Sequence, residues 1–96
     1  MPHSYNLRNT YVRHCRAILL QSKAEEQLYT DKYCEYVCCC ERLKDEIRKE
    51  TDQSKRKVLL DALADGTHLM LLNGMRRVVA MENQRLMKEK LPKWCW

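Results

Sequence analysis

Glycine and proline are almost absent from this chain, and their scarcity limits the folds that are open to it. The 96 residues include two of each, so there is little material for tight turns. Residues that favour the helix, among them alanine, leucine, methionine, glutamate, lysine and arginine, dominate the rest. At this length we expect a single small domain, and the composition predicts that it is all-α.

Hydrophobic periodicity separates three expected helices. The first runs from about Tyr5 to Ser22, the second from about Thr30 to Ile47, and the third from about Ser54 to Lys90. We expect a polar joint at residues 23–30 between the first two helices and another at residues 48–57 before the third. The pattern therefore predicts a three-helix antiparallel bundle.

The ends of the third expected helix carry recognisable signals. Thr51 or Ser54 could cap its start, and Pro92 ends it because proline cannot continue a helix. This third helix is expected to be longer than the other two, so that its C-terminal part projects as an arm. We accordingly expect one domain over residues 1–90 and a C-terminal tail over residues 91–96, which is either a docking anchor or frayed.

Both glycines, Gly66 and Gly74, fall inside the third expected helix, in the stretch "DGTHLMLLNGM". Each costs roughly 0.8–1 kcal/mol relative to alanine in a helix interior. One explanation is a close approach between helices, which glycine permits because it lacks a side chain. The other is a slim helix that leaves a channel for an elongated apolar guest, and the residues by themselves favour the first.

The net charge is +5 and the pI is about 9.0, which favours an acidic protein or nucleic acid as partner, or simply serves solubility. Residues 1–24 contain no Asp or Glu but include Arg8, Arg13, Arg16 and Lys23. An acid-poor, arginine-containing N-terminus is typical of mitochondrial import. No stretch is apolar enough to suggest a membrane span or an export signal.

Six cysteines without an export signal indicate a reducing compartment. Cys34 and Cys38 are spaced as half of a zinc site, but we favour packing, because cysteine behaves as a small hydrophobe. No nucleophile–base spacing and no glycine-rich phosphate loop appears. The sequence therefore favours a protein that is not an enzyme, with a zinc or redox protein and a small basic RNA-binding protein as alternatives from other classes.

Several stretches resemble the LYR-motif family of small mitochondrial proteins. "EIRKETDQ" (residues 46–53) stands where the second helix of that family closes, and "LADGTHLMLLNG" stands at the signature of its third helix. Thr10-Tyr11-Val12 occupies the place of the name-giving Leu-Tyr-Arg, with Arg16 at the next family arginine. "YTDKYCEY" (residues 29–36) and "LLNGMRRVV" (residues 71–79) resemble a member that works on the mitochondrial large ribosomal subunit.

The resemblance implies an LYR-like three-helix adaptor of the mitochondrial matrix that takes part in assembly of the mitochondrial large ribosomal subunit. Its partners would be the acidic mitochondrial acyl carrier protein, a ribosome-silencing-factor-type protein and the subunit itself, with contact to ribosomal RNA. Assembly of respiratory complex I or iron–sulfur biogenesis is the alternative within the family.

The same resemblance assigns roles to individual residues. No cofactor is bound directly, and the acyl-phosphopantetheine of the carrier would enter a slot lined by Tyr11, Cys15, Val37, Cys40, Leu63, Gly66 and Met70. The carrier protein would dock on the basic residues Arg8, Arg13, Arg16, Lys44, Arg48 and Lys49, and no metal or catalytic residue is expected.

Overall fold

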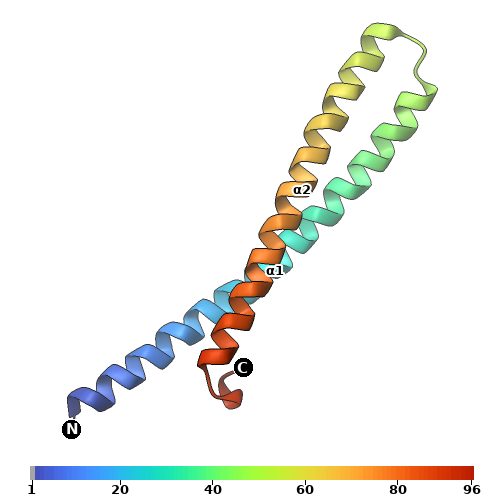
Figure 1. The fold of residues 1–96 in the computed structure, drawn as a ribbon. Coiled ribbons are helices and arrows are strands. Elements are labelled where there is room, and N and C mark those ends of the chain that lie inside the picture. Colours follow the sequence, from blue (N-terminus) through green and yellow to red (C-terminus); the bar gives the residue numbers. More distant parts are fainter. Residues whose placement is uncertain (1) are drawn as a thin grey trace. The chain divides into compact units, whose positions relative to one another are not determined.

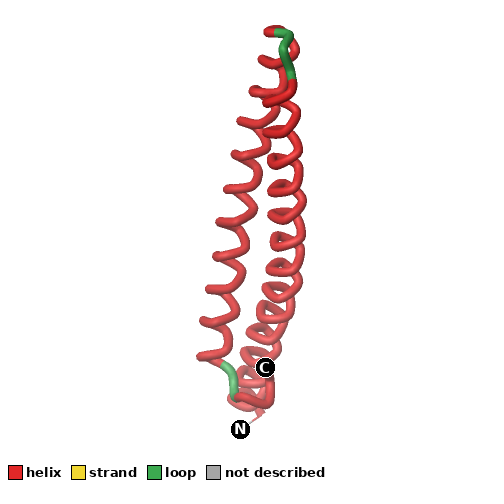
Figure 2. The backbone as a smooth tube through the Cα atoms, turned by 90° about the vertical axis from the view of Figure 1, so that its right-hand side faces the viewer, coloured by secondary structure: helices red, strands yellow, loops and turns green. Residues whose placement is uncertain are grey.

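The computed structural model describes the backbone of residues 2–96 and the side chains of residues 8–96. Helix α1 spans Pro2–Lys49, helix α2 spans Gln53–Lys90, and a short 3-10 helix, η1, covers Lys93–Cys95 (Figure 1). The loops between these elements are short (Figure 2). The expectation of a three-helix bundle is therefore wrong, because the first two expected helices are one helix of 48 residues.

The expected joint at residues 23–30 is helical throughout. It reads "KAEEQLYT", which is polar but contains no glycine or proline and several strong helix formers. Its polar side chains also find partners: Glu25 accepts a hydrogen bond from Gln21 at 2.9 Å, and Glu26 accepts one from Gln84 at 3.0 Å. Polarity alone thus did not interrupt α1.

The loop between the helices comprises residues 50–52, which is shorter than the expected joint at residues 48–57. Asp52 caps α2, because its Oδ1 accepts hydrogen bonds from the backbone N–H groups of Ser54 at 2.8 Å and Lys55 at 3.3 Å. The N-cap is therefore neither Thr51 nor Ser54. Across the loop, Arg56 donates a hydrogen bond to the carbonyl of Ile47 at 3.4 Å.

The chain divides into two compact units, which are described separately. Residues 28–76 form a helical hairpin from the second half of α1 and the first part of α2. Cys40 and Ile47 are buried there, and the Cys40 thiol lies 3.9 Å from the hydroxyl of Thr67. The guanidinium of Arg76 lies 5.8 Å from the ring centre of Tyr29, which is within range of a cation–π contact.

The other unit consists of residues 1–27 and 77–96. Its core contains Cys15, Leu19, Leu91 and Cys95, with Val12 and Met87 packed against it. The C-terminal part of α2 therefore packs against α1, and the expected projecting arm is not formed. The tail folds back as well: Trp96 Nε1 donates to the carbonyl of Lys88 at 3.0 Å, and Lys23 Nζ donates to the main-chain oxygen of Trp96 at 2.6 Å.

Candidate binding surfaces

The residues expected to line an acyl slot are divided between the two units. Tyr11 and Cys15 belong to the unit of residues 1–27 and 77–96, and the other five belong to the hairpin. Cys15, Cys40 and Gly66 are buried and Tyr11 is exposed; the half-buried residues are Val37, Leu63 and Met70. Within the hairpin the structure brings Cys40 and Gly66 into contact.

The two glycines serve this direct contact between α1 and α2. Neither has a positive φ, so backbone conformation does not require them. A Cβ added to Gly66 would lie 3.2 Å from Cys40 Sγ, and one added to Gly74 would lie 3.3 Å from the ring of Tyr33. These side chains occupy the space that the glycines leave, so the geometry agrees with close helix approach and not with an open channel beside Gly66.

The basic residues expected to dock a partner are all exposed. In the hairpin, Lys44 lies 3.4 Å from Glu41 and Arg48 pairs with Asp45. Arg8, Arg13 and Arg16 lie in the other unit on a stretch of α1 where the sequence has no acidic residue before Glu25. Acidic neighbours on the same helix therefore neutralise Lys44 and Arg48 in the hairpin, whereas the N-terminal part of α1 has no acidic residue of its own to neutralise its arginines.

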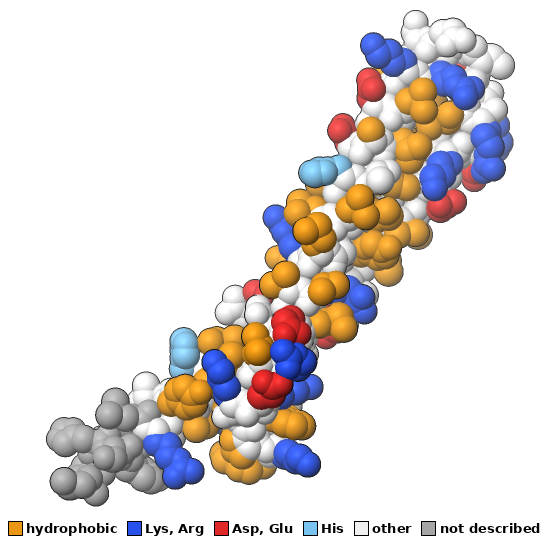
Figure 3. All heavy atoms as spheres, in the orientation of Figure 1, with side chains coloured by type: hydrophobic (Ala, Val, Ile, Leu, Met, Phe, Trp, Pro, Cys, Tyr) orange, Lys and Arg blue, Asp and Glu red, His pale blue; other side chains and the backbone are white. Residues whose placement is uncertain are grey.

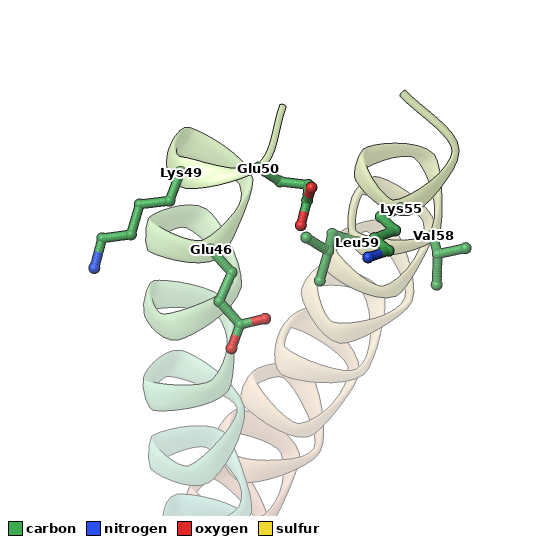
Figure 4. A pocket seen from close by; sticks show the side chains of 6 residues that line it. All are labelled: Glu46, Lys49, Glu50, Lys55, Val58 and Leu59. Carbon is green, nitrogen blue, oxygen red and sulfur yellow. The ribbon is translucent and has the colours of Figure 1, made fainter. Parts of the chain in front are cut away.

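An open hollow of about 550 Å³ lies at the end of the hairpin. Glu46 of α1 and Glu50 of the loop lie on one side of it and Leu59 of α2 on the other, whereas Lys49 extends away from the space between the helices (Figure 4). Lys55 and Val58 complete the lining. Carboxylates and ammonium groups balance one another here, so the hollow does not select a ligand of one charge.

The cysteine run separates into buried and exposed thiols. Cys40 is buried, as the packing interpretation expects, but Cys34, Cys38 and Cys39 are exposed, so packing does not explain them. All six cysteines of the chain are free. Within the part of the chain that the structure describes, no three His, Cys, Asp or Glu side chains cluster closely enough to hold a metal ion.

A second hollow, of about 450 Å³, lies in the unit of residues 1–27 and 77–96. Its lining comes from the first turns of α1 and from the end of α2 with the segment that follows: Arg8, Asn9, Tyr11, Val12, Lys90, Pro92 and Trp94. Hydrogen bonding to Cys15 raises the pKa of Tyr11 above its ordinary value, and partial burial of the phenol adds a smaller increase in the same direction.

Sequence reasoning missed this second hollow because its aromatic side chains are 83 positions apart. The signal that could have found it is the tail "KWCW", whose alternation leaves both tryptophans exposed and buries the cysteine between them. Trp94 is 77% exposed, whereas Cys95 is 8% exposed and packs in the core of the unit. The buried cysteine thus fixes the position of the exposed tryptophan beside α1.

Hydrophobic side chains reach the surface along both helices (Figure 3). Among residues 8–96, seven hydrophobic residues are buried, whereas fifteen large hydrophobic residues are exposed. On the hairpin part of α2, Leu60, Leu71 and Met75 are 46%, 56% and 68% exposed. They lie within about 60° of one another around the helix axis, on the side opposite Gly66 and Asn73.

Neither described helix combines the length and the hydropathy that crossing a membrane requires. Comparison of the chain with protein-family models, with curated proteins and with solved structures finds no match.

Proposed function

We propose that this chain is a non-enzymatic adaptor that binds another protein through the apolar outward side of α2. The observation that carries the proposal is the excess of exposed over buried large hydrophobic side chains among residues 8–96. Exposed hydrophobic residues scattered singly are ordinary, but a group on one side of a helix is typical of an interaction surface.

The distribution of side chains around α2 points the same way. One side of α2 packs against α1 in the hairpin, where Gly66 and Asn73 are buried. The opposite side carries the outward group, which we define as Leu60, Leu71 and Met75 with the exposed Ala64 between them. A helix that is apolar on opposite sides is usually buried on both, and α1 covers only one of them.

The outward group is large enough to contribute measurably to binding. Full burial of one leucine or methionine side chain contributes roughly 1.5–3 kcal/mol. Because these three side chains are already about half covered, a partner helix would gain about 3 kcal/mol from them. That corresponds to about a hundredfold in affinity, so the loss of two of them is detectable in a binding assay.

We further propose, from the resemblance to the LYR-motif family, that the partner is the mitochondrial acyl carrier protein in the mitochondrial matrix. The basic N-terminal part of α1 suits an acidic partner and would mainly raise the association rate. Cys40 fills the space beside Gly66, so the acyl chain of the carrier would lie against the outward group of α2. In this proposal the adaptor, with a ribosome-silencing-factor-type protein, serves assembly of the mitochondrial large ribosomal subunit.

Capture of the tagged full chain from mitochondrial extract, followed by intact-mass analysis, tests both levels of the proposal. We expect a carrier protein whose mass includes phosphopantetheine and an acyl chain. Recovery should fall sharply for the double variant Leu71→Asp/Met75→Asp. The control is Asn83→Asp, which adds one of the two negative charges of the double variant, at a half-buried polar position of α2, and should capture the carrier normally.

The outcomes separate the two levels. If the double variant captures the same proteins in the same amounts as the unaltered chain, the outward group is not the binding surface. If capture depends on Leu71 and Met75 but the bound protein carries no phosphopantetheine, the adaptor proposal holds and the carrier assignment is wrong. Enrichment of complex I or iron–sulfur assembly proteins in place of ribosomal ones would move the assignment to the alternative within the family.

A further inference from the structure

The second hollow places two cationic and two aromatic side chains together. Arg8 and Tyr11 come from the N-terminal part of α1, Lys90 is the last residue of α2, and Trp94 lies in η1. All belong to the unit of residues 1–27 and 77–96. Its volume of about 450 Å³ is within the range of sites that hold small ligands or single groups of a larger one.

The charge of this hollow is of one sign. Neither Asp nor Glu occurs among its seven lining residues. This contrasts with the hollow at the end of the hairpin, whose lining includes Glu46 and Glu50. Arg8 and Lys90 therefore favour a ligand that carries negative charge.

The aromatic side chains are presented to solvent. Trp94 is 77% exposed and Tyr11 is 51% exposed. Trp94 is anchored by its neighbours, because Cys95 is buried in the core and Trp96 is hydrogen-bonded to the carbonyl of Lys88. A large aromatic ring held on the surface beside two cations is the arrangement that proteins use to stack unpaired bases.

We propose that this hollow binds single-stranded nucleic acid, with bases stacked on Trp94 and Tyr11 and phosphates paired with Arg8 and Lys90. Carboxylates of an acidic peptide would gain from the cations but not from the ring faces, which carry partial negative charge. A duplex keeps its bases stacked internally, so it would likewise gain only from the cations. This activity is separate from protein binding through the outward group of α2.

Fluorescence anisotropy with labelled 12-nucleotide single strands of mixed sequence, one RNA and one DNA, tests the proposal on the full chain. We expect Trp94→Ala to weaken binding about five- to a hundredfold, the loss expected for one stacked base. Trp94→Phe should keep most of the affinity, because it retains a stacking face. Circular dichroism of each variant should match that of the unaltered chain, since Trp94 is exposed.

The salt dependence isolates the phosphate contacts. Two contacts predict a slope of about −1.4 for log K against log salt concentration, and Arg8→Ala should reduce it by about 0.7. Arg48→Ala removes an exposed charge from the hairpin and is the control, with the slope unchanged. Tighter binding of the RNA strand than of the DNA strand would assign RNA as the natural ligand. Equal binding would show that the hollow accepts single strands of either kind.

Three results would overturn the proposal. The first is equal affinity of Trp94→Ala and the unaltered chain for the single strands. The second is equal affinity of the unaltered chain for a duplex of the same length. The third is displacement of the single strand by polyglutamate at equivalent charge concentration with the same dependence on Trp94, which would assign the hollow to an acidic protein.

Discussion

Replacement of Gly66 by leucine distinguishes helices in direct contact from helices that leave a channel between them. A Cβ at this position would lie 3.2 Å from Cys40 Sγ, and the outer carbons of leucine would need more room still. Forcing such atoms into a filled contact costs about 1–3 kcal/mol. The gain in helix propensity, about 0.8 kcal/mol, offsets part of this.

The expected net effect is a loss of about 1 kcal/mol in the free energy of unfolding, which lowers the Tm by about 4–8 °C in a chain of this size. Urea unfolding followed by circular dichroism measures it. In the Cys40→Ala background, Gly66→Leu should cost at most half as much as in the unaltered chain, because the thiol that the leucine meets is absent. The coupling between the two sites in this cycle should be about 0.5–1 kcal/mol.

An empty channel beside Gly66 would reverse the sign of the change in the free energy of unfolding. Leucine would then fill unoccupied space and also improve helix propensity, so Gly66→Leu would stabilise the chain by about 0.8 kcal/mol or more. Cys40→Ala would not alter the effect of the leucine. Stabilisation by Gly66→Leu without coupling to Cys40 would therefore refute the direct contact.

Three further expectations follow from the described contacts. Asp52→Ala should lower the free energy of unfolding by about 1 kcal/mol in urea unfolding, since the N-cap of α2 is lost, and no change would show that another residue caps the helix. Hydrogen bonding to Arg85 lowers the pKa of Glu82. The ionised Glu82 carboxylate therefore contributes to stability above the ordinary pKa of a carboxyl, and this contribution is lost as pH falls through the lowered pKa. Glu82→Gln should remove that part of the acid dependence when the free energy of unfolding is measured against pH. A thiol reagent should modify three cysteines rapidly in the native chain and the other three only on unfolding, the first set being Cys34, Cys38 and Cys39, and fast modification of all six would contradict the burial.

Helical secondary structure could be predicted from composition, because scarce glycine and proline leave few alternatives to the helix. The number of helices could not. The polar stretch at residues 23–30 was interpreted as a joint, but a polar stretch made of helix formers continues a helix when its side chains find partners. Gln84, which reaches Glu26 from α2, is such a partner, and no local pattern shows it.

The sites show the same division between local and tertiary information. The periodic positions of Gly66 and Cys40 could be derived from the sequence, but their mutual contact depends on the register of α1 against α2. The proximity of Trp94 to Tyr11 depends on the fold of the tail, which local propensity does not specify. The outward group of α2 could not be identified from the sequence, because its exposure depends on the number of helices: a three-helix bundle has a core position for every apolar stripe, and two helices do not.

Amide hydrogen exchange across residues 23–30 determines whether α1 is one uninterrupted helix, which leaves no third α-helix among residues 2–96 to enclose a guest. We expect these amides to be protected as strongly as those of neighbouring turns of α1, because they are hydrogen-bonded within a packed helix. Exchange at the rate of an unstructured peptide over these residues, between protected segments on either side, would contradict it and restore a joint between two separate helices.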